Sequence, residues 1–170
     1  MVALQSSRRG NEADKTCGFS RSSGGYGAAA SFSTTVNRLA GYLGLFMTYH
    51  LTITQKPAYL HAIVSGQHSK ANVVGFLRDV LRECTDRQCF KVLIEERLDG
   101  PSLGIVEVFE IVFSGSIEAS GKLKAIAYVD ARAEVKLMKF AEDVAVNRAM
   151  PLRVFATVAE AEKWLLDNGR

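Results

Sequence analysis

Residues that could do chemistry are concentrated in RLDGPSLG, at positions 97–104. Asp99 and Ser102 could act together with His68 as a catalytic triad, in which the imidazole takes the proton of the serine hydroxyl. No Gly-x-Ser-x-Gly sequence surrounds Ser102, and Pro101 directly before it favours a tight turn over an exposed nucleophile. A weak hydrolase is therefore the third of the functions considered for this chain, and enzymes as a class are not favoured.

Charged residues also close two other segments that read as strands. Arg97 ends the sequence EER, and Asp130 and Arg132 begin and end the sequence DAR. The carboxyl ends of parallel strands meet at one edge of a sheet, which is where open α/β sheets bind ligands. These three residues could therefore hold an anionic head group, although two solvated loops joined by an ion pair are the simpler interpretation.

The common signatures of metal and nucleotide sites are missing from the sequence. It contains no His-Glu-x-x-His and no glycine-rich phosphate loop. The cysteines at positions 17, 84 and 89 are too few and too unevenly spaced for a disulfide framework or a complete zinc site. We therefore expect no cofactor, no metal site and a cytoplasmic location.

The composition of the chain changes abruptly at Met47. Residues 1–46 hold seven of the fourteen glycines, with five basic and two acidic residues, whereas residues 47–170 hold sixteen of each charge. We expect residues 1–46 to be a disordered extension upstream of a natural start at Met47, and residues 47–170 to form one domain. The neutral domain argues against nucleic-acid binding, and the apolar run at 39–47 is about half as long as a membrane-spanning helix. No membrane span is expected.

Regular patterns begin after Met47. Short apolar or alternating runs predict five strands, and apolar residues at helical spacing predict four helices, the first of them capped by Ser69. The predicted strands are 48–54, 59–66, 90–96, 122–130 and 151–156. The order ββαβαβαβα predicts an α/β layered domain with a mostly parallel sheet of about five strands, an antiparallel edge hairpin and about four helices. Because 48–54 would be an exposed edge, we also consider a homodimer.

The second predicted helix begins near Ile105, directly after the turn. Ser102 is its expected N-cap, and the polar residues 114–121 are expected to form a loop after it. Glu107 and Glu110 lie on its predicted outer side. The residues spaced for its core-facing side are Ile105, Val108, Phe109 and Val112.

The order of elements, the LDGPSLG turn, and the segments FAEDVAVNR and RVFATVAEAEKWL resemble the STAS domains of bacterial anti-sigma-factor antagonists. They resemble most the small stand-alone STAS-like proteins related to Sec14 domains, over residues 48–167. In anti-sigma antagonists this strand ends in Asp-Ser-Ser-Gly-Leu-Gly, and a partner kinase phosphorylates the serine two places after the aspartate. Asp99 matches that aspartate, but Pro101 occupies the phosphoacceptor position. Ser102 could replace it only if the turn shifts.

The resemblance implies a non-enzymatic regulatory domain that binds a protein partner of unknown identity through its second and third helices. The exposed candidates on that surface are Asp99, Ser102, Glu107 and Glu110. The alternative is a small lipid- or metabolite-binding protein of Sec14-like kind. Its pocket would contain Arg97, Phe109, Phe113, Asp130, Arg132, Leu137 and Phe140. A cavity lined by those aromatic residues would favour the alternative, and an exposed apolar or acidic patch around Ser102 would favour a protein partner.

Overall fold

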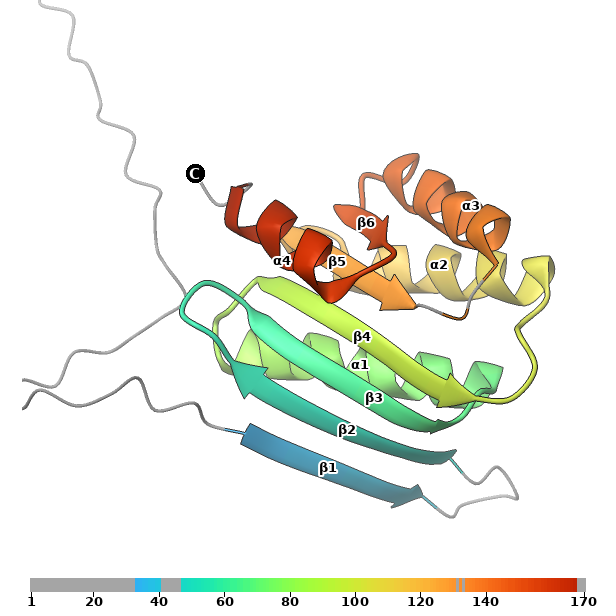
Figure 1. Cartoon of the computed structure of the whole chain (residues 1–170), viewed down its shortest axis with the longest axis horizontal. Coiled ribbons are helices and arrows are strands. Elements are labelled where there is room, and N and C mark those ends of the chain that lie inside the picture. The colour runs from blue at the N-terminus through green and yellow to red at the C-terminus, as the bar shows by residue number, and fades with distance from the viewer. Residues whose placement is uncertain (1–32, 41–46, 131, 133, 168–170) are drawn as a thin grey trace, which may run out of the picture.

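A computed structural model describes residues 33–40, 47–130, 132 and 134–167 (Figure 1). Within these residues six strands form one sheet in the order β1-β2-β3-β4-β5-β6, together with four helices. The strands are β1 (Ser33–Ala40), β2 (Met47–Gln55), β3 (Leu60–Gln67), β4 (Lys91–Asp99), β5 (Ala125–Asp130) and β6 (Leu152–Phe155). The helices are α1 (Lys70–Asp86), α2 (Ile105–Ala119), α3 (Val135–Val146) and α4 (Val158–Asp167).

The predicted α/β fold class is confirmed. β2 and β3 form the antiparallel hairpin, and β3, β4, β5 and β6 are parallel neighbours joined by helices. Ser69 is the N-cap of α1, and its hydroxyl oxygen accepts the backbone N–H of Asn72 at 3.3 Å. None of the helices in the described ranges combines the length and apolar character needed to cross a membrane.

The sheet has one strand more than the sequence predicted. β1 pairs antiparallel with β2 along its whole length, from Ser33 opposite Thr54 to Ala40 opposite Met47. The prediction that residues 48–54 form an exposed edge is therefore wrong, because β1 occupies that edge. β1 lies inside the segment expected to be a disordered extension, and the rest of that segment falls outside the described residues.

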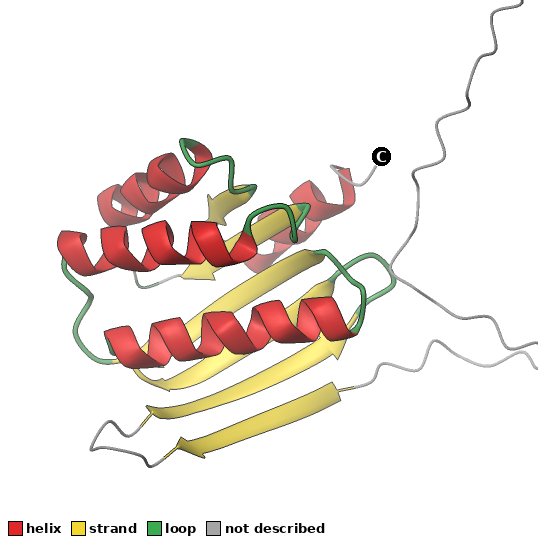
Figure 2. Cartoon of the chain, turned by 180° about the vertical axis from the view of Figure 1, so that it is seen from behind, coloured by secondary structure: helices red, strands yellow, loops and turns green. Residues whose placement is uncertain are grey.

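The helices cover the two faces of the sheet unequally. α1, α2 and α3 lie on one face, and α4 alone crosses the other (Figures 1 and 2). The parallel strands follow one another in chain order, so crossovers of the same hand bring all three connecting helices to the same side. α4 follows the last strand and returns over β4, β5 and β6 on the opposite side.

Two apolar clusters fill the space on either side of the sheet. The larger one packs α1 and α2 against β2, β3 and β4, and its fully buried members include Leu51, Ile53 and Phe76. The smaller one packs α4 against the other face, where Leu93 and Leu165 are fully buried. Alternation along β4 sends Leu93 to one cluster and its neighbours to the other, as a strand buried on both faces requires.

α2 is longer than predicted and begins at a different cap. The expected loop at 114–121 is wrong, because the helix continues to Ala119. Ser114 and Ser116 do not break it, since their hydroxyls donate to the carbonyls of Glu110 and Phe113 one turn earlier, at 2.8 and 2.7 Å.

The N-cap of α2 is Gly104, so the prediction of Ser102 in that role is also wrong. The Gly104 N–H donates to Oε2 of Glu107 at 2.9 Å. A carboxylate in the first helical turn also suits the positive end of the helix dipole. Glu107 therefore stabilises the start of α2 instead of standing free on its surface.

Candidate functional site

α2 carries a row of large apolar side chains on its outer surface. Ile105, Phe109, Phe113 and Ile117 are spaced four residues apart, so they follow one line along the helix. Together with Val106 their exposed fractions lie between 38% and 65%. We call these five residues the α2 stripe. The prediction that Ile105 and Phe109 face the core is wrong.

The opposite side of α2 is apolar as well. Val108, Ile111 and Ala119 are buried against the rest of the domain. A surface helix normally has one apolar side, which faces the core, and polar residues on the rest of its surface. α2 instead has an apolar side that is buried and a second apolar side that is left exposed by the described residues.

Paired charges border the α2 stripe on the side of α1. Lys70 pairs with Glu110, and Arg78 donates two bonds to the Glu118 carboxylate, with the closest approach at 3.0 Å. All four side chains are more than a third exposed, so each pair contributes little to stability. The ion pairs keep these four long side chains at the edge of the stripe, so the apolar residues stay uncovered.

Arg148 borders the stripe on the other side. Its guanidinium lies 3.7 Å from the ring centroid of Phe113, and its Nε donates to the Ser116 hydroxyl at 2.8 Å. A guanidinium stacked on an aromatic face in this way is a stabilising cation–π contact. The stripe is thus flanked by Glu110 and Glu118 on one side and by Arg148 on the other.

Three of the four residues predicted as partner contacts lie on α2 or in the turn directly before it. Ser102 is exposed in the turn, and Glu107 caps α2. Glu110 is paired with Lys70, and the exposed Asp99 accepts a bond from Arg132 at 2.5 Å. The structure therefore places Ser102, Glu107 and Glu110 beside the exposed apolar residues, with Asp99 at the end of β4.

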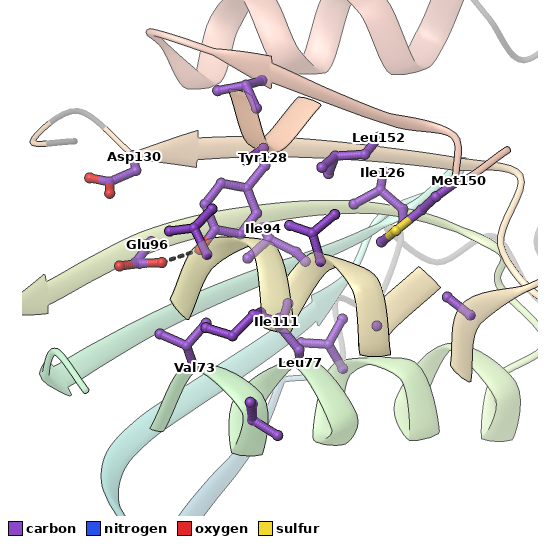
Figure 3. Close-up of a pocket in the computed structure, with 18 of the residues that line it drawn as sticks. Val73, Leu77, Ile94, Glu96, Ile111, Ile126, Tyr128, Asp130, Met150 and Leu152 are labelled. Atoms are coloured by element: carbon purple, nitrogen blue, oxygen red, sulfur yellow. Dashed lines mark hydrogen bonds between the residues drawn. The ribbon is translucent and has the colours of Figure 1, made fainter. Parts of the chain in front are cut away.

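A cavity of about 150 Å³ lies beneath α2, between α1, α3 and the sheet (Figure 3). It is lined mainly by aliphatic side chains and methionines, among them Val73, Leu77, Ile94, Ile111, Ile126, Met150 and Leu152. His68, Glu96, Tyr128 and Asp130 line its polar end. The cavity lies on the same side of the sheet as the α2 stripe, with α2 separating the two.

The predicted pocket residues are distributed over several places. Leu137 and Asp130 line the cavity. Arg97 and Arg132 border a separate polar depression together with Asp99. Phe109 and Phe113 point outward in the α2 stripe, and Phe140 is half-buried on α3. The aromatic lining expected of a lipid pocket is thus not what surrounds the cavity.

The strand register brings the polar residues of the cavity together. Ile94 pairs with Tyr128, and Glu96 pairs with Asp130, on the neighbouring strands β4 and β5. Residues two apart on a strand share a face of the sheet, so these four side chains all point towards the face covered by α1, α2 and α3. Glu95 points the other way, where its carboxylate lies 3.2 Å from Nε2 of His61.

Glu96 is the central polar group of this cluster. It is only 8% exposed, and it accepts a hydrogen bond from the Tyr128 hydroxyl. Burial raises the pKa of Glu96 above its usual value, and the nearby Asp130 adds to that effect. The Tyr128 bond, His68 and Arg132 act in the opposite direction. Burial likewise raises the pKa of Tyr128, so its hydroxyl remains a donor.

His68 lies between the turn before α2 and Glu96. Its Nδ1 lies 2.7 Å from the carbonyl oxygen of Pro101, which can only accept, so Nδ1 donates there. Its Nε2 lies 3.2 Å from Oε1 of Glu96. Both ring nitrogens of His68 are engaged, and neither contacts Ser102 or Asp99, so the hydrolase triad is not assembled.

Glu96 and Tyr128 were missed by sequence reasoning, which looked for function in the loops. A signal was present in β4, where Val92, Ile94 and Glu96 alternate on one face of an otherwise buried strand. An acidic residue in such a position is rarely placed there without a partner.

No family model, curated protein or solved structure matches this chain. Among the residues that the structure describes, no group of three or more His, Cys, Asp and Glu is arranged to hold a metal ion. The function must therefore be argued from the α2 stripe and the cavity.

Proposed function

We propose that this protein is a non-enzymatic, STAS-like interaction domain that acts in the cytoplasm and binds another protein through α2. The α2 stripe is the observation that carries this proposal. Four large apolar side chains in one row, with Val106 beside them, form a patch of the kind that marks protein interaction sites, whereas single exposed apolar residues are ordinary.

The geometry of the stripe indicates the form of the partner. From Ile105 to Ile117 the helix rises by about 18 Å, at about 1.5 Å per residue. An amphipathic helix of similar length, with apolar residues three and four apart, would match this row. The three acidic residues of α2 are already engaged, Glu107 by the Gly104 N–H and the other two by Lys70 and Arg78, so apolar contacts carry the recognition.

The test compares exposed apolar residues on two helices, α2 and α4. The double variant Phe109→Ser/Ile117→Ser removes the centre and the end of the stripe, and Leu166→Ser removes an exposed apolar residue on α4. Proteins that co-purify with the full chain from its own cells are identified by mass spectrometry. The complex is then rebuilt from purified components, and its dissociation constant is measured for all three chains.

We expect the double variant to weaken the rebuilt complex by at least about thirtyfold, since buried aromatic and aliphatic contacts at an interface centre commonly contribute about 2 kcal/mol or more. Leu166→Ser should leave the affinity unchanged. Equal affinity for the wild type and the double variant would contradict the proposal. A rebuilt complex that contains only a second copy of this chain would identify the stripe as a homodimer interface instead.

The cavity favours a second candidate function, the binding of a small metabolite. A volume of about 150 Å³ suits a single ring-sized molecule and is too small for the acyl chains of a phospholipid. The alternative considered from the sequence, a lipid- or metabolite-binding protein, is thereby narrowed to small molecules.

A further inference from the structure

We propose that the cavity between α1, α2, α3 and the sheet binds a ring-sized apolar molecule whose alcohol or amine group donates a hydrogen bond to Glu96. The inference specifies the second candidate function and does not depend on partner binding by the α2 stripe. Either can therefore fail while the other stands.

The size of the ligand follows from the cavity. An apolar protein cavity of about 150 Å³ is large enough to bind benzene and stays dry when it is empty. The walls here are contributed by six elements of the fold and not by one loop. They include Val73 and Leu77 from α1, Ile111 from α2, Ile94 from β4, Ile126 from β5 and Leu152 from β6 (Figure 3). Val112 from α2 and Leu137 from α3 line it as well.

The chemistry of the head group follows from the polar end. A carboxylate has about four lone-pair positions, and Glu96 uses one for the Tyr128 hydroxyl and one towards His68. Acceptor capacity therefore remains on Glu96, directly beside the apolar walls. A ligand that donates a hydrogen bond can use it, whereas a hydrocarbon cannot.

The charge that the ligand head group can carry follows from the same polar residues of the cavity. Glu96 and Asp130 are neighbours across β4 and β5, and both line the cavity. A ligand carboxylate would face two acidic side chains in a site lined mainly by apolar residues, where like charges repel. An ammonium or a neutral hydroxyl meets no such repulsion. The His68 and Tyr128 side chains are already directed at Glu96, and Arg78, which also lines the cavity, is paired with Glu118, so these groups do not offset this selectivity.

The turn before α2 borders the cavity. Ser102 and Leu103 line the cavity beside His68, and Ser102 is exposed to solvent. The backbone N–H of His68 donates to the Asp99 carbonyl at 2.6 Å, which ties the start of α1 to this turn. The residues that the sequence suggested as a switch or triad thus border the polar end of the cavity.

The test uses three probes with the same ring and different head groups: benzyl alcohol, benzylamine and benzoate. Binding to the full chain at neutral pH is measured by titration calorimetry, and the site is mapped by methyl chemical shifts of Ile94, Ile111 and Ile126. We expect benzyl alcohol and benzylamine to bind and to shift these methyl groups. Benzoate should bind at least about tenfold more weakly, because one unfavourable charge contact in a poorly hydrated site exceeds about 1.4 kcal/mol.

Two matched pairs of variants locate the site. Val112→Phe fills the cavity, and Val106→Phe makes the same change on the exposed side of the same helix. Glu96→Gln removes the charge at the polar end, and Glu95→Gln does so on the other face of the sheet. Val112→Phe should abolish binding of both probes, and Glu96→Gln should weaken benzylamine more than benzyl alcohol. Val106→Phe and Glu95→Gln should change neither.

Several results would overturn the proposal. Benzoate binding as tightly as benzylamine would show that the cluster does not select for donors. Absence of methyl shifts with all three probes at millimolar concentrations would show that the cavity does not admit ligands of this size. If Val112→Phe lowers the melting temperature too far for titration, Glu96→Gln alone decides, and an unchanged benzylamine affinity would then contradict the assignment of Glu96.

Discussion

The two faces of the sheet differ in how completely the space beside them is packed and in how much apolar surface remains exposed. On the α4 face, Leu165 is fully buried, Trp164 packs against Phe155 with ring centroids 5.6 Å apart, and the Tyr59 hydroxyl donates to Glu162 at 2.6 Å. On the face covered by α1, α2 and α3, a cavity remains inside and an apolar row remains outside. The second face carries features that folding alone does not require, and this is why both proposed functions lie there.

α2 is the element responsible for this difference. Its inner side forms part of the cavity wall and its outer side forms the stripe, so one helix borders both candidate sites. A better-filled interior would add buried contacts and a polar outer face would leave less apolar surface exposed, and changes of this kind commonly raise stability at the expense of function. If the two faces differ in this way, substitutions on them should differ in their effect on stability.

The largest difference should appear between two leucine truncations. Leu165→Ala on α4 should lower the free energy of unfolding by about 3 kcal/mol, since it opens a new cavity in a filled core. Leu77→Ala on α1 should cost only about 1–2 kcal/mol, because Leu77 already faces the existing cavity and is partly exposed. Urea unfolding measures both. Equal costs would mean that the two faces are equally well packed.

The second prediction concerns the pH dependence that Glu96 imposes. Below its usual pKa of 4.5 the carboxyl is neutral in both the folded and the unfolded chain, so burial carries no charge penalty. As the pH rises above 4.5 the unfolded chain ionises first, because burial raises the pKa of Glu96 in the folded state. The contribution of Glu96 to stability should therefore fall between pH 4.5 and its folded pKa.

Glu96→Gln lacks this penalty. Its stability relative to the wild type should rise between pH 4.5 and neutral pH, as followed by urea unfolding at each pH. Glu95→Gln serves as the control, since it makes the same change one residue away, on the opposite face of the sheet. A constant difference between wild type and Glu96→Gln across this range would show that the folded protein ionises Glu96 as readily as the unfolded chain does.

The smallest change in the free energy of unfolding is expected for a substitution in the α2 stripe. Ile117 is 62% exposed, so Ile117→Ser should change the free energy of unfolding by no more than about 0.5 kcal/mol. Ile111→Ser, on the buried side of the same helix, should be far more costly. If Ile117→Ser destabilised the isolated chain as much as Ile111→Ser, then the outer side of α2 would be packed within the protein and would not be an interaction surface.

Much of the fold could be predicted because periodicity and caps agreed along the chain. Residues 90–96 are apolar and β-branched, as a buried parallel strand requires, and Ser69 precedes the first amphipathic helix. At the start of α4, the Thr157 hydroxyl donates to the Glu160 carboxylate at 3.0 Å, as expected of a Thr-x-x-Glu sequence before a helix. Local chemistry and tertiary structure favour the same conformation in these segments.

The remaining errors have identifiable physical causes. β1 (Ser33–Ala40) is short and lies in a sequence rich in glycine and serine, and this composition was taken to indicate disorder for the whole segment. Ser114 and Ser116 looked like loop residues, although their hydroxyls can bond back within a helix. α2 is apolar on both sides, so periodicity alone could not tell which side faces the core, and Phe109 was assigned to the wrong one.

The site was harder to predict than the fold because it is made by neighbours across strands. Glu96, Tyr128 and His68 come from three different elements and meet only when the sheet register is known. A single sequence gives the strands and not their register. In α2, Ile105 and Phe109 were recognised as helical apolar residues, but Ile117 was placed in the expected loop at 114–121 and the exposure of the row was not predicted.

The central claim is that the outer surface of α2 contacts another protein, and site-specific photo-crosslinking tests it most directly. A photo-reactive amino acid is placed at position 117 on α2 or at position 166 on α4, both exposed and apolar in the wild type, in cells that produce the full chain. We expect a discrete adduct of higher mass from position 117, containing a second protein, and none from position 166. No adduct from position 117, or the same adduct from both positions, would contradict it.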